Sequence, residues 1–172
     1  DKSLGDIPVF TAAAIAGRII KTLSLRTTTT LPSLAVRLGE IRKSFTAAAT
    51  ELETKYEFID FDLLLKMLEN RKVELDDFLV HGDVHYENIL MSESGDWKAI
   101  DPKPLIGDIE FSVHELLTTI IDSGELEYQK ALEWSIIRSI DYYLWAVSSD
   151  LTIDPPRCKR VYDALMKHYS IN

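Results

Sequence analysis

Three polar side chains are spaced in a way that phosphate chemistry could use. Asp83 and Asn88 both lie in segment 81–88, whose sequence is HGDVHYEN, and Asp101 follows farther along the chain. Phosphoryl transfer needs a carboxylate beside the attacking hydroxyl and oxygen ligands for the Mg²⁺ that bridges the phosphates. An Asp and an Asn in one tight loop can face a single site from either side. A second Asp at the end of a nearby strand would complete the set of metal ligands.

Short apolar runs around these residues predict the strands that position them. The run 78–80 (FLV) ends where the loop begins, and the runs 88–91 and 97–100 are separated by a turn at 94–96. We expect the last two runs to form a small hairpin whose far strand delivers Asp101. Loops at strand ends that are held by a helical scaffold are a common place for functional side chains.

Helical periodicity covers most of the remaining chain. Apolar residues recur at helical spacing from Val9 to Leu23, where Asp6 is expected to cap the helix and Pro8 to occupy its first turn. The β-branched run 27–30 predicts a loop. Further helices are expected at 32–54 with a break near Gly39, and at 62–71, 109–121, 126–148 and 156–169. The predicted fold is therefore mainly α with a small β hairpin.

The composition narrows the classes of protein to consider. With 172 residues and 46% hydrophobic content, the chain is expected to form one domain with its own core. The net charge of −9 and the scattered basic residues argue against a nucleic-acid partner but suit a cationic ligand. Neither a bilayer-spanning run nor a signal peptide is evident, so no membrane partner is expected. The single cysteine, Cys158, excludes an internal disulfide and fits a cytoplasmic location.

The central motifs resemble a known family. The pattern His81-x-Asp83-x-x-x-x-Asn88 is similar to the catalytic loop of the protein-kinase superfamily, with Gly82 where protein kinases carry Arg. In this version, His-Gly-Asp-Val-His, the loop resembles that of the aminoglycoside phosphotransferases. The run 99–108 (AIDPKPLIGD) looks most like the streptomycin kinase and hydroxyurea phosphotransferase branch. The resemblance is dense over residues 78–117, and Leu-Trp at 144–145 agrees with it.

The resemblance implies a fold and a set of residue roles. Asp83 would be the catalytic base, and Asn88 and Asp101 would bind Mg²⁺ and, through it, ATP. His81, His85 and Asp108 would support the loop, whereas Lys103 is assigned no chemical step. The acceptor would be a hydroxyl group of a small molecule, with streptomycin-like aminoglycosides first and hydroxyurea second.

The resemblance also implies what the chain lacks. Residues 1–172 would form the C-terminal lobe of a protein-kinase-like fold, without the N-terminal lobe that carries a glycine-rich loop and a strand-borne Lys. The chain alone is therefore expected to have no kinase activity. Its uncovered interlobe face is expected to be apolar and to favour a homodimer.

The sequence departs from the family pattern at two places. Tyr86-Glu87 stand where the family usually has Pro-Gly before the Asn, so the loop is expected to turn less tightly. Relatives commonly carry a second Asp after Gly-Asp-Pro, whereas this chain continues from Asp108 into IEFS. Glu110 or Glu115 could take the place of that missing Asp.

Other interpretations stay open at this point. The run Gly-Asp-Val-His at 82–85 also resembles metal-dependent phosphoesterases, which hold two metals with Asp and His side chains. Such enzymes need further ligands, for which only His114 and His168 remain among the histidines. The chain could also be a catalytically silent remnant lobe that acts as a binding module. Asp108, Glu110 and Glu115 could contact a cationic antibiotic or simply lie at solvated helix starts. The tryptophans Trp134 and Trp145 are expected in the core.

Overall fold

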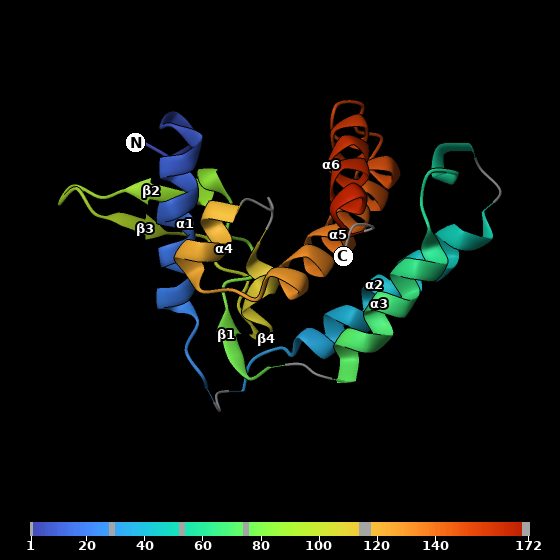
Figure 1. The fold of residues 1–172 in the computed structure, drawn as a ribbon, viewed down its shortest axis with the longest axis horizontal. Coiled ribbons are helices and arrows are strands. Elements are labelled where there is room, and N and C mark those ends of the chain that lie inside the picture. The colour runs from blue at the N-terminus through green and yellow to red at the C-terminus, as the bar shows by residue number, and fades with distance from the viewer. Residues whose placement is uncertain (1, 28–29, 52–53, 74–75, 114–117, 170–172) are drawn as a thin grey trace. The chain divides into compact units, whose positions relative to one another are not determined.

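The computed structural model describes residues 2–27, 30–51, 54–73, 76–113 and 118–169, and the chain divides into two compact units (Figure 1). Unit 1 comprises Asp1–Leu34 and Asp76–Ala131, and unit 2 comprises Ala35–Leu75 and Leu132–Asn172. The residues are mostly helical, and all the strands of the described residues lie in unit 1. The predicted mainly α composition is confirmed.

Within the described residues, unit 1 contains two complete helices, two small sheets and three short 3₁₀ turns, which are labelled η. Strand β1 pairs antiparallel with β4, with Val80 opposite Leu105, and β2 pairs antiparallel with β3, with Ile89 opposite Ala99. The elements in chain order are η1 (Leu4–Asp6), α1 (Val9–Leu23), β1 (Phe78–Val80), η3 (Tyr86–Asn88), β2 (Ile89–Met91), β3 (Trp97–Ala99), β4 (Leu105–Gly107), η4 (Ile109–Ser112) and α4 (Thr118–Gly124).

Helices α1 and α4 form the centre of unit 1 because α1 presents small side chains to its neighbour. Ala13, Ala16 and Gly17 are buried on one side of α1 and face the core that also contains Ile120 and Ile121 of α4. A Cβ atom built on Gly17 would lie 2.5 Å from the backbone oxygen of Ile120. The two backbones can approach this closely only because position 17 has no side chain.

Replacing Gly17 by Ala is therefore expected to lower the free energy of unfolding by roughly 1–3 kcal/mol, the usual cost of overpacking a core. The matched control is Gly39→Ala in a helix of unit 2, because a Cβ there meets nothing within 4 Å. The control should raise stability by about 0.5–1 kcal/mol, since Ala is the better helix former. Urea unfolding of residues 1–172, followed by circular dichroism, measures both, and equal effects of the two variants would contradict this packing.

Unit 2 is helical and packs around aromatic and aliphatic side chains. Its elements are α2 (Leu34–Thr50), η2 (Thr54–Tyr56), α3 (Phe61–Val73), α5 (Tyr128–Ser148) and α6 (Asp154–Tyr169), with the division between the units falling near the start of α2 and inside α5. Phe45 of α2, Met67 of α3 and Trp134 of α5 are almost completely buried. The hydroxyl oxygen of Tyr162 in α6 accepts a hydrogen bond from the backbone N–H of Asp60 at 3.1 Å.

The structure corrects several expectations about single elements. Asp6 does not cap α1, because its carboxylate accepts the backbone N–H of Ser3 at 2.7 Å within η1, and Pro8 directly precedes the helix. Helix α2 continues through Gly39. A Cβ atom at this position would meet no other atom within 4 Å, so the absence of a side chain loses no packing and only the lower helix propensity of glycine opposes the helix. Trp145 is 54% exposed and stacks on Tyr142, so the expectation that it lies in the core is wrong.

The segment after Pro104 also differs from the expected helix at 109–121. It forms strand β4 and the short turn η4, and the described part of helix α4 spans Thr118–Gly124. Strand β4 is only three residues long and follows Pro102 and Pro104. The sequence there has no alternation of apolar and polar residues that would have predicted a strand. The expected hairpin at 88–100 is confirmed, with its turn at Gly95 in a positive-φ conformation (φ 86°).

Candidate active site

The loop 81–88 lies between β1 and β2, and backbone hydrogen bonds tie it to the segment that follows β3. The N–H of Lys103 donates to the carbonyl of His81 at 2.9 Å, and the N–H of Ile100 donates to the carbonyl of Asn88 at 2.9 Å. Both ends of the loop are thus joined to the segment that carries Asp101. Two stretches that are separated in the sequence are held together by the protein backbone.

Gly82 is required by this arrangement. Its φ is +78°, in the region that favours glycine, and a Cβ atom there would lie 2.2 Å from the carbonyl oxygen of Lys103. The close approach of the two backbones at this point is possible only without a side chain. The glycine of the His-Gly-Asp motif therefore has a direct structural reason in this chain.

Asn88 closes the loop with its side chain. Its Nδ2 donates a hydrogen bond to the backbone carbonyl of Asp83 at 3.0 Å. This bond fixes the orientation of the amide, so that Oδ1 is the atom that can accept from, or coordinate to, another group. Side-chain amide oxygens are among the ligands that bind Mg²⁺ and Ca²⁺ in proteins.

Asp101 adopts an uncommon backbone conformation directly after the hairpin. Its φ is +52°, a left-handed conformation that costs free energy for residues other than glycine, although Asp and Asn tolerate it best. Two other residues of the described chain, Glu125 and Asp150, have similar φ values, but both follow the ends of helices, where the conformation is common. Strain away from a helix end is found most often at functional sites.

His81 lies at the base of the loop and is 8% exposed. Its Nδ1 accepts the backbone N–H of Asp83 at 3.4 Å. Burial lowers the pKa of His81, while the backbone of Ile100 and the carboxylates of Asp83 and Asp101 act in the opposite direction. The lowered pKa favours the neutral imidazole at pH 7.

His85 and Glu87 form a pair on the outer side of the loop. The His85 Nδ1 and a carboxylate oxygen of Glu87 are 2.8 Å apart, and the Glu87 side chain is 81% exposed. The glutamate that replaces the usual Gly of the family thus has a partner within the loop. The contact joins two residues that flank Tyr86 and so stabilises the turn η3.

Asp108 lies outside the loop and is completely buried. Its Oδ1 accepts the N–H of Asp76 at 2.9 Å and lies 3.6 Å from Lys130 Nζ, which also pairs with Asp76 at 2.7 Å. Burial opposes the charge of Lys130, but these acidic partners raise its pKa overall. Asp108 therefore ties the residues just before β1, the strand that leads into the loop, to the start of α5.

Glu110 is also buried, with one carboxylate oxygen accepting the N–H of Glu127 at 3.1 Å. Burial raises the pKa of this carboxyl group. Asp108 and Glu110 are thus buried, and neither lies at a solvated helix start, one of the two alternatives that the sequence left open. Glu115 and His114 lie outside the described residues.

Lys103 is the neighbour of Asp83 that sequence analysis left without a chemical role. Its Nζ lies 2.6 Å from Asp83 Oδ2. Nothing in the spacing of Lys103 indicated this contact, because it depends on the pairing of β1 with β4, which the sequence did not predict. The structure places a cation directly on the candidate catalytic carboxylate.

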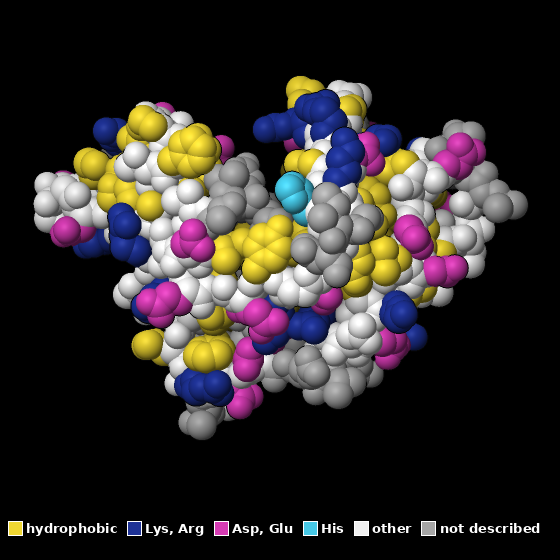
Figure 2. All heavy atoms as spheres, viewed as in Figure 1, with side chains coloured by type: hydrophobic (Ala, Val, Ile, Leu, Met, Phe, Trp, Pro, Cys, Tyr) yellow, Lys and Arg dark blue, Asp and Glu magenta, His cyan; other side chains and the backbone are white. Residues whose placement is uncertain are grey.

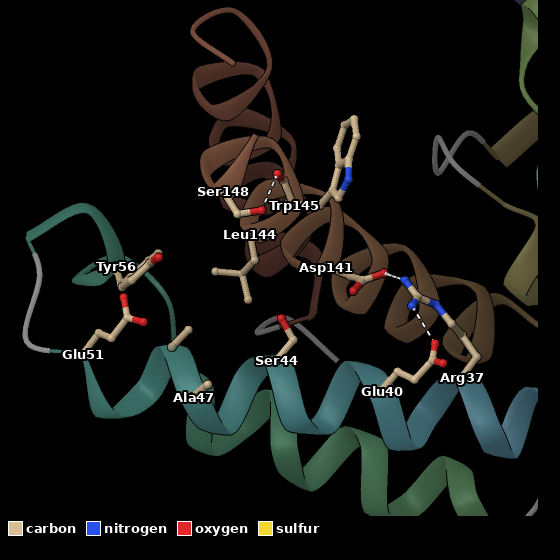
Figure 3. A pocket seen from close by; sticks show the side chains of 11 residues that line it. Arg37, Glu40, Ser44, Ala47, Glu51, Tyr56, Asp141, Leu144, Trp145 and Ser148 are labelled. Carbon is tan, nitrogen blue, oxygen red and sulfur yellow. Dashed lines mark hydrogen bonds and ion pairs between the residues drawn. The ribbon is translucent and has the colours of Figure 1, made fainter. Parts of the chain in front are cut away.

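A separate pocket of about 370 Å³ lies within unit 2, between α2 and α5 (Figure 3). Its lining includes the acidic residues Glu40, Glu51 and Asp141, the cation Arg37 and the aromatic residues Tyr56 and Trp145, with the indole of Trp145 turned away from α2. Arg37 closes one end by pairing with Asp141 at 2.5 Å. Burial raises the pKa of Asp141, and Arg37 acts in the opposite direction. Acidic and aromatic groups around one cavity suit an organic cation.

The part of the chain that the structure describes has neither a cluster of metal-binding side chains nor a helix suited to a membrane. Within residues 2–27, 30–51, 54–73, 76–113 and 118–169, no group of three or more His, Cys, Asp or Glu side chains is arranged to hold a metal ion. The metal-dependent phosphoesterase alternative depends on such a group. None of the helices in the same ranges is long and apolar enough to cross a membrane.

Comparison with known sequences gives one family and several relatives. The profile of the family described as aminoglycoside/hydroxyurea antibiotic resistance kinase matches residues 8–162. A streptomycin 6-kinase from Streptomyces griseus is 32% identical over 112 residues, which cover 53% of this chain and 36% of that protein. A hydroxyurea phosphotransferase from Kitasatospora aureofaciens is 28% identical over 169 residues, which cover 88% of this chain and 48% of that protein. The chain thus spans less than half the length of these two relatives.

Comparison with solved structures shows the fold. A choline kinase from Streptococcus pneumoniae superposes with a TM-score of 0.68 at 16% identity, covering 95% of this chain and 65% of that structure. A second structure of that protein, in complex with AMP, gives a TM-score of 0.66 at 17% identity, covering 92% and 63%. Almost the whole chain therefore shares its fold with part of a kinase.

Proposed function

The chain belongs to the aminoglycoside/hydroxyurea antibiotic resistance kinase family, and on this premise we propose that it carries the catalytic loop of an ATP-dependent kinase that phosphorylates a hydroxyl group of a small molecule. The observation that carries the proposal is the joining of loop 81–88 to the segment of Asp101 by the hydrogen bonds of His81 and Asn88. This arrangement brings the residues of the kinase pattern into one part of unit 1. The names of the two bacterial relatives support the same reaction class.

In this proposal Asp83 is the catalytic base. The acceptor hydroxyl hydrogen-bonds to the Asp83 carboxylate and attacks the γ-phosphorus of ATP, while the bond from that phosphorus to the bridging oxygen breaks and ADP leaves with the electron pair. The hydroxyl proton passes to Asp83 late in the step. His81, neutral and buried, holds the backbone of Asp83 in place through its Nδ1.

Asn88 and Asp101 would hold Mg²⁺. The donors fit that ion, because Mg²⁺ takes oxygen ligands and the hydrogen bond of Asn88 Nδ2 leaves Oδ1 as the coordinating atom of its side chain. The strained φ of Asp101 gives a second, independent reason to place a functional group there. When bound, the ion would neutralise charge on the phosphates of ATP.

We further propose that residues 1–172 correspond to the C-terminal lobe of a protein-kinase-like fold. The likeness to part of a choline kinase structure supports this assignment. In that superfamily a second lobe supplies the loop that covers the phosphates and the Lys–Glu pair. Residues 1–172 by themselves are therefore expected to form no phosphorylated product.

For the acceptor we propose an aminoglycoside of the streptomycin type, with hydroxyurea second. An aminoglycoside is a cationic ligand, and the pocket within unit 2 offers carboxylates and aromatic rings that could bind one. In this proposal Glu51 would contact the cationic acceptor, with Asp141, which is paired with Arg37, beside it.

The test is phosphate transfer from γ-labelled ATP by the kinase-active protein that contains residues 1–172, with streptomycin and hydroxyurea as separate acceptors. Phosphorylation of streptomycin that Glu51→Gln weakens through a higher KM, and that Glu93→Gln leaves unchanged, would support both acceptor and pocket. Glu93 is a suitable control because it is an exposed carboxylate on the hairpin turn. Transfer to hydroxyurea alone would reverse the order of acceptors, and transfer to neither would contradict this choice of acceptors.

The binding-module alternative has one observation in its favour. Val9 and Phe10 at the start of α1 are 49% and 70% exposed, and Figure 2 shows hydrophobic side chains gathered on this part of unit 1. An exposed apolar surface of this kind favours association. We propose that a homodimer of residues 1–172 would use it, and sedimentation equilibrium that finds only monomer at high concentration would exclude such a dimer.

A further inference from the structure

We propose that Lys103 is a catalytic residue, whose ammonium group binds the phosphoryl group during its transfer and aligns the Asp83 carboxylate beside it. The inference rests on the proposed kinase function. Its starting point is the contact between Lys103 Nζ and Asp83 Oδ2 at 2.6 Å. A cation on the base stands next to the position at which the attacking hydroxyl and the phosphoryl group must meet.

The backbone holds Lys103 in place without help from its side chain. The N–H of Lys103 donates to the carbonyl of His81 at 2.9 Å, and its own carbonyl lies against Gly82. Pro102 and Pro104 flank it, so its backbone is restricted to extended conformations. The side chain is therefore not needed to build the loop.

The ion pair contributes little to the stability of the fold. The Lys103 side chain is 69% exposed, although that of Asp83 is only 18% exposed. Because the cation stays largely in solvent, the attraction is screened and its contribution to stability is modest. A lysine that is positioned by rigid backbone but adds little stability has its main use in an interaction that forms with substrate. Its exposure leaves room for a phosphate to approach the ammonium group.

The charges around the loop explain why a cation is needed there. Segment 81–88 contains no Lys or Arg, and it carries the carboxylates of Asp83 and Glu87. Asp101 adds a third acidic residue between Ile100 and Lys103, whose N–H groups are hydrogen-bonded to the two ends of the loop. ATP adds further negative charge to this acidic surrounding. In the transfer step, the oxygen–phosphorus bond to the acceptor forms as the bond to ADP breaks, and the charge on the equatorial oxygens must be stabilised. Lys103 would supply positive charge there and keep its own proton throughout.

The experiment compares Lys103→Met with Lys103→Arg and with the control Lys98→Met in the kinase-active protein that contains residues 1–172. Lys98 is an exposed lysine on β3, so its replacement changes the net charge equally. Lys103→Met is expected to lower kcat by about 10²- to 10³-fold, the usual effect of removing one group that stabilises transition-state charge. KM for ATP and for the acceptor should change less than about threefold, because the group acts mainly in the transition state. Lys103→Arg should recover part of kcat, and Lys98→Met should match the wild type.

A second readout does not depend on turnover. Affinity for ADP alone should be similar in the wild type and Lys103→Met, whereas affinity for ADP with aluminium fluoride, which mimics the transferring phosphoryl group, should fall by about the same factor as kcat. Equal loss of both affinities would overturn the proposal, as would a change in KM without a change in kcat. Lys103→Gln, which keeps a polar side chain, replaces the Met variant if the latter melts at a lower temperature. A wild type that transfers no phosphate would instead refute the kinase function itself.

Discussion

Asp83→Asn is expected to lower kcat by about 10³-fold, within the range that positioned acid–base groups contribute. The loop itself should remain intact, because Asn88 and His81 contact the backbone of Asp83 and not its carboxylate. Asparagine has nearly the same shape as aspartate but cannot accept the hydroxyl proton. The variant should therefore bind ATP and acceptor with KM values close to those of the wild type.

The matched control for Asp83→Asn is Glu93→Gln, which removes a carboxylate from the turn between β2 and β3. Glu93 is exposed and lies outside loop 81–88, so it should not take part in proton transfer. We expect its kcat to stay within about threefold of the wild type, as for a surface change away from the chemistry. Initial-rate kinetics with saturating ATP measure both variants. If Asp83→Asn kept wild-type kcat, the base would have to be another group.

Asp101→Asn is the change with the second-largest expected effect. Loss of a metal-binding carboxylate should lower kcat by about 10²- to 10³-fold, comparable to the loss of other groups that stabilise charge in the transition state. It should also shift the Mg²⁺ dependence of the rate to higher concentration, because an amide is a weaker ligand for this ion. Stability should change by less than about 1 kcal/mol, since Asn tolerates the φ of +52° as well as Asp does.

Asp150→Asn is the control for the backbone conformation. Asp150 has a φ of +57° after the end of α5, where it takes part in the hydrogen bonds that terminate the helix. This variant should keep both activity and stability. Rates measured over a series of Mg²⁺ concentrations, together with thermal unfolding, separate the two positions. A normal Mg²⁺ dependence in Asp101→Asn would remove Asp101 from the metal site.

The sequence predicted the hairpin and most helices because their patterns are local. The alternation of turn residues and apolar runs from 88 to 100 identified β2 and β3, and helical periodicity identified α1, α3, α5 and α6. Strand β4 was missed because its three residues acquire their structure only by pairing with β1, at long range. The break expected at Gly39 was wrong because the free energy that one glycine costs a helix is smaller than the free energy that the rest of α2 gains by staying helical.

The residues of the candidate site were predicted from a motif, and not from hydrophobic periodicity. Residue types and spacing identified Asp83, Asn88 and Asp101, and their chemical roles stay predictions. The contact of Lys103 with Asp83 could not be predicted, since it needs the two strands that bring residues 80 and 105 opposite each other. The buried position of Asp108 was also hidden, because an acidic residue before a predicted helix usually lies in solvent.

The hydrogen bonds that close the loop have a consequence for the thermodynamics of ligand binding. Asn88 Nδ2, the N–H of Ile100 and the N–H of Lys103 already have protein partners before any nucleotide arrives. Binding then has little backbone entropy left to remove at the loop, so less of the interaction energy is lost to ordering. Calorimetry should accordingly show a small heat-capacity change for this part of the molecule, in contrast to a loop that folds around its ligand.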